Sequence, residues 1–321
     1  MLLAALVVAV LSSLAFGSNP LSIGEVWQGF WAHNGSDAAD IVWGLRGPRT
    51  IVGMIVGAAF GVAGALIQSL TRNPLADPGI LGVNAGAGFA VTLGVGFFGL
   101  TSITGYVWFA FLGAAIATLL VYLIGSAGRG SAPPVALVLA GVALGAVLTG
   151  FSTTLALLNP DTFRAVRNWG LGSIDRTELD QTLSVAPFLV IGLLLALALA
   201  GSLNSLALGD DLATSLGTRV LRTRVLGLVS LTLLAGTATA LTGGIAFVGL
   251  MVPHIVRWFT GPDQRWIIAY SALGAAALVL LADVVGRVVG RPGEVEAGIV
   301  TAVIGAPVLI ALVRRRNVSG L

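Results

Sequence analysis

The stretch LSVAPFLVIGLLLALALAGSL, from Leu183 to Leu203, contains no charged side chain. A helix of about 20 apolar residues crosses the hydrocarbon core of a bilayer, so this stretch has the length and composition of a membrane span. Its apolar residues run continuously and do not alternate with polar ones, which indicates a helix and not a strand of a membrane barrel. The stretch therefore predicts a helical membrane protein.

The composition of the whole chain supports this fold class. The chain has 321 residues, of which 56% are hydrophobic and 10% are charged, whereas soluble domains carry about 25% charged residues. We expect an all-α polytopic membrane protein with a single transmembrane domain over residues 1–321. About ten segments are predicted to span the membrane, near residues 2–16, 48–70, 82–100, 106–125, 135–158, 183–203, 225–241, 245–259, 267–289 and 299–313.

The first segment, Leu2 to Phe16, is open to a second interpretation. It resembles the apolar core of a signal peptide, because small residues follow it. No basic residue precedes it and much membrane protein follows it, so a first span is the preferred interpretation. The segment is short for a span, and the sequence leaves open whether further residues precede Met1.

Two residue types are absent from the sequence. There is no cysteine and no lysine, so all 17 basic residues are arginine. A phosphate-binding Walker A loop needs a lysine, so ATP hydrolysis would belong to a partner chain. We find no metal-ligand cluster and no catalytic triad, and we expect no metal, cofactor or catalytic residue on this chain. The net charge of +3 fits a membrane protein with basic cytoplasmic loops better than nucleic-acid binding.

The distribution of arginine predicts the orientation in the membrane. If the N-terminus is cytoplasmic, arginines outnumber acids in the inside loops, and acids outnumber arginines in the outside loops. This is the expected bias of membrane proteins. Both termini are then cytoplasmic, and so is the polar loop over residues 206–224.

The loop LALGDDLATSLGTRVLRTR, residues 206–224, carries the signals of a short helix. Asp210, after Gly209, is predicted to be its N-cap, and Asp211 places a negative charge in the first turn. Gly217 is predicted to end the helix in a left-handed conformation. A helix this short needs something to pack against. The loop alone leaves open whether it is an ordinary turn or a docking site for another protein.

An apolar surface of this short helix is the candidate docking surface. Leu212 and Leu216 lie one turn apart on one face, beside Ala213. We predict that this face, carrying Leu212, Ala213 and Leu216, enters the partner.

Few ionisable side chains fall within the predicted spans. Asp283 and Arg287 stand four residues apart and share a helix face. An acid inside a membrane is costly unless it is paired or hydrated, so we favour a structural ion pair over a proton relay. His254 follows Pro253 on another predicted span, where a packing or capping role is preferred to a proton path.

The stretch RNPLADPGILG, from Arg72 to Gly82, interrupts the helical pattern. Its two prolines force a break, and its glycines permit tight backbone turns. The stretch is long for a plain cytoplasmic turn and stays partly apolar, which suggests a segment packed at the inner mouth of a pathway. A second interrupted segment, GGIAFVGLMVPH over residues 243–254, predicts a weak inverted repeat, a common plan of transporters.

The motif RGPR places Arg46 and Arg49 three residues apart at the outer start of a span. Pro48 suits the first turn of a helix. The two arginines could anchor the helix at the membrane interface or present charge to an acidic partner outside. The residues alone do not decide between these roles.

Several stretches match one family, in order and at the family's separations. The match covers nearly the whole chain after the first segment, and the chain resembles the FecCD-type permeases of type II bacterial ABC importers, which take up ferric siderophores, haem and cobalamin. The matching stretches are RGPRTIVGMIVGAAFGVAGALIQSLTRNPLADPGILGVNAGAG (46–88), LVLAGVALG (137–145), GDDLATSLG (209–217), GGIAFVGLMVPHIVR (243–257), LADVVGR (281–287) and GIVTAVIGAP (298–307).

The resemblance implies a type II importer permease fold in the bacterial cytoplasmic (inner) membrane. Two permease subunits, two copies of this chain or this chain with a similar one, would bind two cytoplasmic ATPase subunits that hold ATP and Mg. An extracytoplasmic binding protein would deliver the cargo. The resemblance assigns ATPase coupling to Gly209, Asp210, Asp211, Leu212, Ala213, Leu216 and Gly217, binding-protein contact to Arg46, Arg49 and Arg287, and the inner gate to Asn73, Pro74 and Leu75.

The cargo is expected to be a ferric siderophore complex, with haem or cobalamin as the alternatives within the family. Cobalamin permeases carry small hydroxyl residues where this chain has Ala132–Pro133–Pro134, which weakens that assignment. A proton-coupled secondary transporter is the alternative from another class. Four further arginines of the predicted outer loops receive no role from the resemblance: Arg164, Arg167, Arg176 and Arg291.

Overall fold

The computed structural model describes residues 1–31, 36–100, 103–127, 134–175, 177 and 179–314. These residues form helices and loops and contain no strand, as the all-α prediction requires. In chain order the elements are α1 (Leu2–Ala15), α2 (Ile23–Trp31), α3 (Asp37–Ala39), η1 (Asp40–Arg46), α4 (Gly47–Thr71), η2 (Pro78–Leu81), α5 (Val83–Phe98), α6 (Ile103–Ser126), α7 (Pro134–Leu158), α8 (Pro160–Gly170), α9 (Leu179–Ala207), α10 (Asp210–Ser215), α11 (Val220–Leu231), η3 (Thr232–Gly236), α12 (Thr237–Thr242), α13 (Val248–Thr260), α14 (Gln264–Val289) and α15 (Ala297–Arg314).

Among the described residues, 6 continuous helical segments are long and apolar enough to cross a membrane. The other predicted segments fall on the shorter helices α1, α5, α13 and α15. The number of membrane crossings therefore stays a prediction. The 6 long segments are Asp37–Thr71, Val107–Ser126, Val135–Leu158, Leu179–Ala207, Val220–Thr242 and Gln264–Val289.

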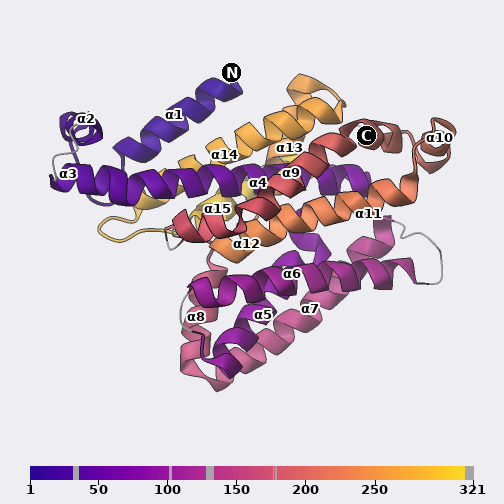
Figure 1. The fold of residues 1–321 in the computed structure, drawn as a ribbon, viewed down its shortest axis with the longest axis horizontal. Coiled ribbons are helices and arrows are strands. Elements are labelled where there is room, and N and C mark those ends of the chain that lie inside the picture. The colour runs from indigo at the N-terminus through magenta and orange to yellow at the C-terminus, as the bar shows by residue number, and fades with distance from the viewer. Residues whose placement is uncertain (32–35, 101–102, 128–133, 176, 178, 315–321) are drawn as a thin grey trace.

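Helix α4 lies at the centre of the larger group of helices, packed against α14, α13 and α9 (Figure 1). Its glycines allow this packing. A Cβ on Gly57 would lie 2.7 Å from the Cα of Ala276 in α14. Gly64 likewise meets the backbone of Gly249 in α13. Small residues let membrane helices approach closely and gain van der Waals contact, so these glycines help to fix the position of α4.

A second group contains α5, α6, α7 and α8 (Figure 1). Of the 6 long segments, the one formed by α7 is the least covered by other helices. Only 17% of its most apolar 18-residue stretch is buried, compared with 78% for the segment that contains α4. The exposed side of α7 carries Thr149, Thr153 and Gly150 together with large apolar residues.

Two segments that lie between the predicted spans contain helices. Helix α2 begins at a reciprocal cap, in which the backbone N–H of Ser22 donates to Glu25 and the N–H of Glu25 donates to the Ser22 hydroxyl. Helix α8 begins at Asn159, whose side chain accepts from two backbone N–H groups, with Pro160 in the first turn. Both are standard start signals. These helices were not predicted, because outside residues 206–224 only long apolar segments were assigned as helices.

The helices define two ends of the molecule. Figure 1 shows α2, α3 and α8 at one end and α10 at the other. We call these the α2 end and the α10 end.

Candidate functional site

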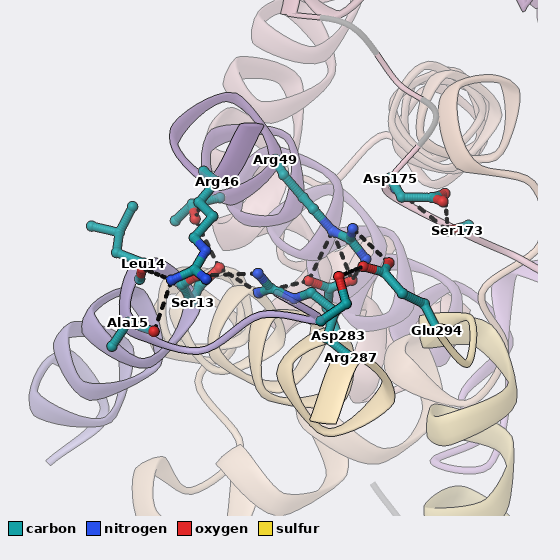
Figure 2. A network of polar contacts seen from close by, with 12 residues as sticks. Ser13, Leu14, Ala15, Arg46, Arg49, Ser173, Asp175, Asp283, Arg287 and Glu294 are labelled. Carbon is teal, nitrogen blue, oxygen red and sulfur yellow. Dashed lines mark hydrogen bonds and ion pairs between the residues drawn. The ribbon is translucent and has the colours of Figure 1, made fainter. Parts of the chain in front are cut away.

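A network of ion pairs lies at the α2 end, where α4 meets α14 (Figure 2). Arg49 reaches two carboxylates: its Nη2 lies 2.6 Å from Asp283 Oδ1, and its Nη1 lies 2.8 Å from Glu294 Oε2. Asp283 also pairs with Arg287, one turn later in α14, at 2.9 Å. The carboxylate of Asp283 is therefore held between two guanidinium groups.

The burial of the paired side chains indicates a structural role for this network. The side chains of Asp283 and Arg287 are 1% and 2% exposed, so neither charge is stabilised by water. A buried charge needs a partner and further hydrogen bonds, and each of these two has them. An aspartate fixed in this way is suited to a structural role and not to a proton relay, for which it would have to release and accept protons.

Arg46 and Arg287 also fasten helix α1. Arg46, 4% exposed, donates to the carbonyl oxygens of Leu14 and Ala15, each at 2.8 Å. These carbonyls end α1, where a positive charge complements the helix dipole. Arg287 donates to the carbonyl and the hydroxyl of Ser13. Our prediction that both arginines contact a binding protein stays a prediction, and in this structure their donors are turned inward.

Arg49 is the most accessible of the three predicted contact residues, with 15% of its side chain exposed. It lines an open cavity of about 590 Å³ at the α2 end, together with Asp175, Asp180 and Glu294. Burial raises the pKa of Glu294, but the neighbouring Arg49 guanidinium, together with Ser18 and Arg287, outweighs this and holds that pKa below its usual value. Glu294 is thus an ionised partner that keeps Arg49 at the cavity wall.

A second cluster lies at the α10 end. The carboxylate of Asp210, the first residue of α10, lies 3.1 Å from Arg72 Nη2 and 2.9 Å from Arg224 Nη2. Arg72 follows α4 and Arg224 belongs to α11, so one carboxylate joins three elements. Our prediction that Asp210 is the N-cap was wrong: Gly209 occupies that position. Asp210 is instead the first residue of the helix, and its carboxylate binds the two arginines.

Helix α10 ends as predicted but exposes a smaller surface than predicted. Gly217 has φ of +82°, and the N–H of Thr218 donates to the Ala213 carbonyl, as in a glycine-terminated helix. Leu212 and Leu216 are 58% and 64% exposed, whereas Ala213 is fully buried. Ala213 packs inside its own chain, so our prediction that it shares the docking face was wrong. The exposed apolar surface is formed by Leu212 and Leu216.

The interrupted stretch after α4 is held in a defined shape. Arg72 ends the helix with φ of +49°, a left-handed conformation that is uncommon for residues other than glycine. The side chain of Asn73 accepts from the N–H of Leu75 at 3.0 Å, and Pro74 lies within this turn. The predicted gate residues thus directly follow the arginine that binds Asp210.

Polar side chains of α4 and α13 meet near the same end. The buried Gln68 donates to the carbonyl of Leu250 at 3.1 Å and accepts from Arg257 at 2.6 Å. His254, one turn before Trp258 on α13, packs edge-on against its ring at 5.5 Å between centroids. This geometry agrees with a packing role for His254.

The arginines without a predicted role differ in their surroundings. Arg164 pairs with Asp161, and Arg291 donates to the carbonyl of Gly17. Arg167 has no carboxylate within ion-pair distance among the described residues. Arg176, Ala132 and Pro133 lie outside the described residues.

Our sequence analysis missed three partners of these clusters: Glu294 at the α2 end, and Arg72 and Arg224 at the α10 end. Glu294 and Arg72 lie far along the chain from the residues they bind, and Arg224 lies 14 residues after Asp210 beyond the end of α10, so helical spacing gives no signal for these pairings. A weaker signal was available, because each is a charged residue beside a predicted span, where an unpaired charge is costly.

Known proteins resemble this chain over nearly its whole length. The model of the FecCD transport family matches residues 5–315. The chain is 50% identical, over 99% of its length and 95% of the relative, to the ferric enterobactin transport system permease protein FepD of Escherichia coli. It is 39% identical, over 96% of its length and 91% of the relative, to the Fe(3+)-citrate import system permease protein YfmD of Bacillus subtilis.

Two further comparisons cover a haem relative and the fold. The hemin transport system permease protein HmuU of Yersinia pestis is 32% identical over 98% of the chain and 95% of the relative. A solved inward-facing structure of a metal-chelate type ABC transporter superposes with a TM-score of 0.85, at 27% identity and 97% coverage of both chains. The fold is therefore that of an ABC importer permease, and the chain belongs to the FecCD transport family.

Proposed function

We propose that this chain is the membrane permease subunit of an ATP-driven importer that carries a ferric siderophore complex. The observation that carries the proposal is the 50% identity, over almost the whole chain, to a ferric enterobactin permease. Haem is the alternative cargo, and it is the weaker one because the hemin permease is 32% identical. ATP and Mg would be bound by partner subunits, since this chain has no lysine for a Walker A loop.

The α10 end is the proposed docking site for the ATPase subunits. Leu212 and Leu216 are large apolar side chains exposed on a short helix, which fits a groove on another protein. Asp210 ties this helix to Arg72 and Arg224. A displacement of α10 would therefore pull on Arg72, the residue next to the proposed gate at Asn73. Nucleotide drives transport only if the ATPase binds one permease conformation better than the other.

The exposed side of α7 is the proposed contact with a second permease subunit. Its low burial leaves a long helix without neighbours on much of its surface. Gly150 and the hydroxyls of Thr149 and Thr153 lie on that surface. Small and hydroxyl-bearing residues favour close packing against another helix or a polar pathway over contact with lipid tails. The second subunit is a copy of this chain or a similar permease.

The α2 end is proposed to face outward and to receive the extracytoplasmic binding protein. Its open cavity presents Arg49, a charged side chain that an acidic residue of the binding protein can reach. The α10 end and both termini would then be cytoplasmic, in the inner membrane of a bacterium. The arginine distribution in the loops supports this orientation.

Transport by the reconstituted importer tests this function. The chain, its ATPase and its binding protein are reconstituted in liposomes. Entry of radioiron-labelled ferric enterobactin is then measured with and without ATP on the side of the membrane where the ATPase lies. We expect uptake that requires hydrolysable ATP and persists when a protonophore collapses the proton gradient. Uptake that continues without ATP but stops with the protonophore would instead establish the proton-coupled alternative.

A further inference from the structure

Helix α8, at the α2 end, carries two arginines in different electrostatic situations. Arg164 lies 3.3 Å from the carboxylate of Asp161, one turn earlier on the same helix. Arg167 contacts uncharged groups: the side chain oxygen of Asn168 at 3.4 Å and the ring of Phe163, whose centroid is 6.0 Å from the guanidinium carbon. The positive charge of Arg167 is therefore not neutralised by a described residue.

Arg167 lines a cavity of about 250 Å³ between α5, α7 and α8. Arg167 is the one charged residue among the described lining residues, and no acid is among them. The cavity opens beside the exposed side of α7, where the second permease subunit is proposed to pack. The lining residues are Asn84, Ala85, Gly88, Thr149, Ser152, Thr153, Ala156, Phe163, Val166 and Arg167.

The other polar groups around the cavity do not compensate the charge of Arg167. The hydroxyls of Ser152 and Thr153 donate to backbone carbonyls of their own helix, at 2.8 and 2.9 Å. A cationic fork with no acid beside it makes a site suited to a ligand rich in negatively charged oxygen atoms.

We propose that Arg167 and this cavity form one half of a binding site for a net-negative ferric chelate, of the catecholate or carboxylate type, at the α2-end mouth of the pathway. Such complexes carry excess negative charge because their ligands contribute more charge than the iron neutralises. The ring of Phe163 and the side chain of Val166 supply an apolar wall beside the charge. This inference rests on the proposed function and adds the charge class of the cargo.

A charge series at Arg167 tests the site in the complete importer. ATP-driven uptake of radioiron-labelled ferric enterobactin, a trianionic tris(catecholate), is measured for Arg167→Lys, Arg167→Gln and Arg167→Glu, with Arg164→Gln as the matched control. We expect Arg167→Gln to lower the initial rate about tenfold and Arg167→Glu to lower it further, with Arg167→Lys between the unsubstituted importer and Arg167→Gln, because lysine keeps the charge but not the fork. Arg164→Gln should change the rate by less than about twofold, because its exposed ion pair contributes little.

The outcomes separate this inference from the proposed function. Membrane amounts of each variant are compared by immunoblot, so that a loss of protein is not read as a loss of uptake. If Arg167→Gln lowers uptake no more than Arg164→Gln, or if the three Arg167 variants do not follow their charge, the anion site is refuted while the importer function stands. If the unsubstituted importer shows no ATP-driven uptake of ferric chelates, the proposed function falls, and the inference falls with it.

Discussion

The two ends of this protein use the same arrangement in different surroundings. At the α2 end, Asp283 lies between Arg49 and Arg287, with its side chain 1% exposed. At the α10 end, Asp210 lies between Arg72 and Arg224, with its side chain 39% exposed. The ion-pair distances are similar, and the main difference is the burial of the shared carboxylate, since the Arg224 side chain at the α10 end is itself only 6% exposed.

This difference indicates different roles. Removing one partner of a buried ion pair leaves an uncompensated charge and costs about 3–5 kcal/mol. An exposed pair contributes at most about 1 kcal/mol, because water and salt screen it. The cluster at the α2 end is therefore part of what holds α1, α4 and α14 together. The cluster at the α10 end adds less to stability, because water reaches the Asp210 carboxylate and the Arg72 side chain.

The largest expected effect on stability comes from Asp283. Asp283→Asn leaves two buried guanidinium groups with too little negative charge nearby, so we expect a loss of about 3–5 kcal/mol in the free energy of unfolding. Thermal unfolding of the purified protein in one detergent measures it. The matched change Asp210→Asn should cost less, because the Asp210 carboxylate is reached by water. Equal losses at the two sites would contradict the distinction drawn from burial.

The second prediction concerns coupling through α10. Replacing Leu212 and Leu216 together by aspartate removes the exposed apolar surface, and we expect ATP-driven uptake to fall by at least about tenfold, since each apolar side chain buried in an interface contributes about 1.5–3 kcal/mol. The unfolding temperature should stay near that of the unsubstituted protein, because both side chains are already exposed. Normal uptake by this variant would rule out α10 as the docking helix.

A smaller effect is expected from the ion pairs that connect α10 to the gate segment. Asp210→Asn should weaken the link to Arg72 and Arg224, so that more ATP is hydrolysed for each chelate transported. Asp40→Asn is the control, since Asp40 is an exposed acid at the α2 end and forms none of the ion pairs found among the described residues. The ratio of ATPase rate to uptake rate is the measurement. An equal ratio in the two variants would show that the link to Arg72 does not carry the movement.

The smallest predicted effect is on the pH dependence of stability. The pKa of Glu294 is held below its ordinary value of 4.5 by Arg49, so its ionised form is favoured in the folded state. The stability from this pair is complete above pH 4.5 and is lost as the pH falls through the lower folded-state pKa. The difference in unfolding temperature between the unsubstituted protein and Glu294→Gln should therefore be constant near neutral pH and shrink in acid. A difference that grows in acid would reverse the assigned sign.

The sequence predicted the helical class and the family, because apolar length and matched motifs are local properties of the chain. It also predicted the closeness of Asp283 and Arg287, which follows from helical spacing. It could not predict that Asp283 is shared with Arg49, or that Asp210 is bound by Arg72, since these pairs join distant segments. Burial of Ala213 escaped prediction for the same reason: the side of α10 that packs inward depends on α9 and α11.

The most direct test of the account asks which end of the permease meets the ATPase. The chain contains no cysteine, so Leu216→Cys and Phe163→Cys each introduce a single thiol, one at the α10 end and one on α8 at the α2 end. Both side chains are exposed, at 64% and 42%. In membranes that contain the complete importer, a short thiol-to-amine cross-linker should join the ATPase to the chain through position 216 and not through position 163. Cross-linking through position 163, with none through position 216, would contradict the central claim.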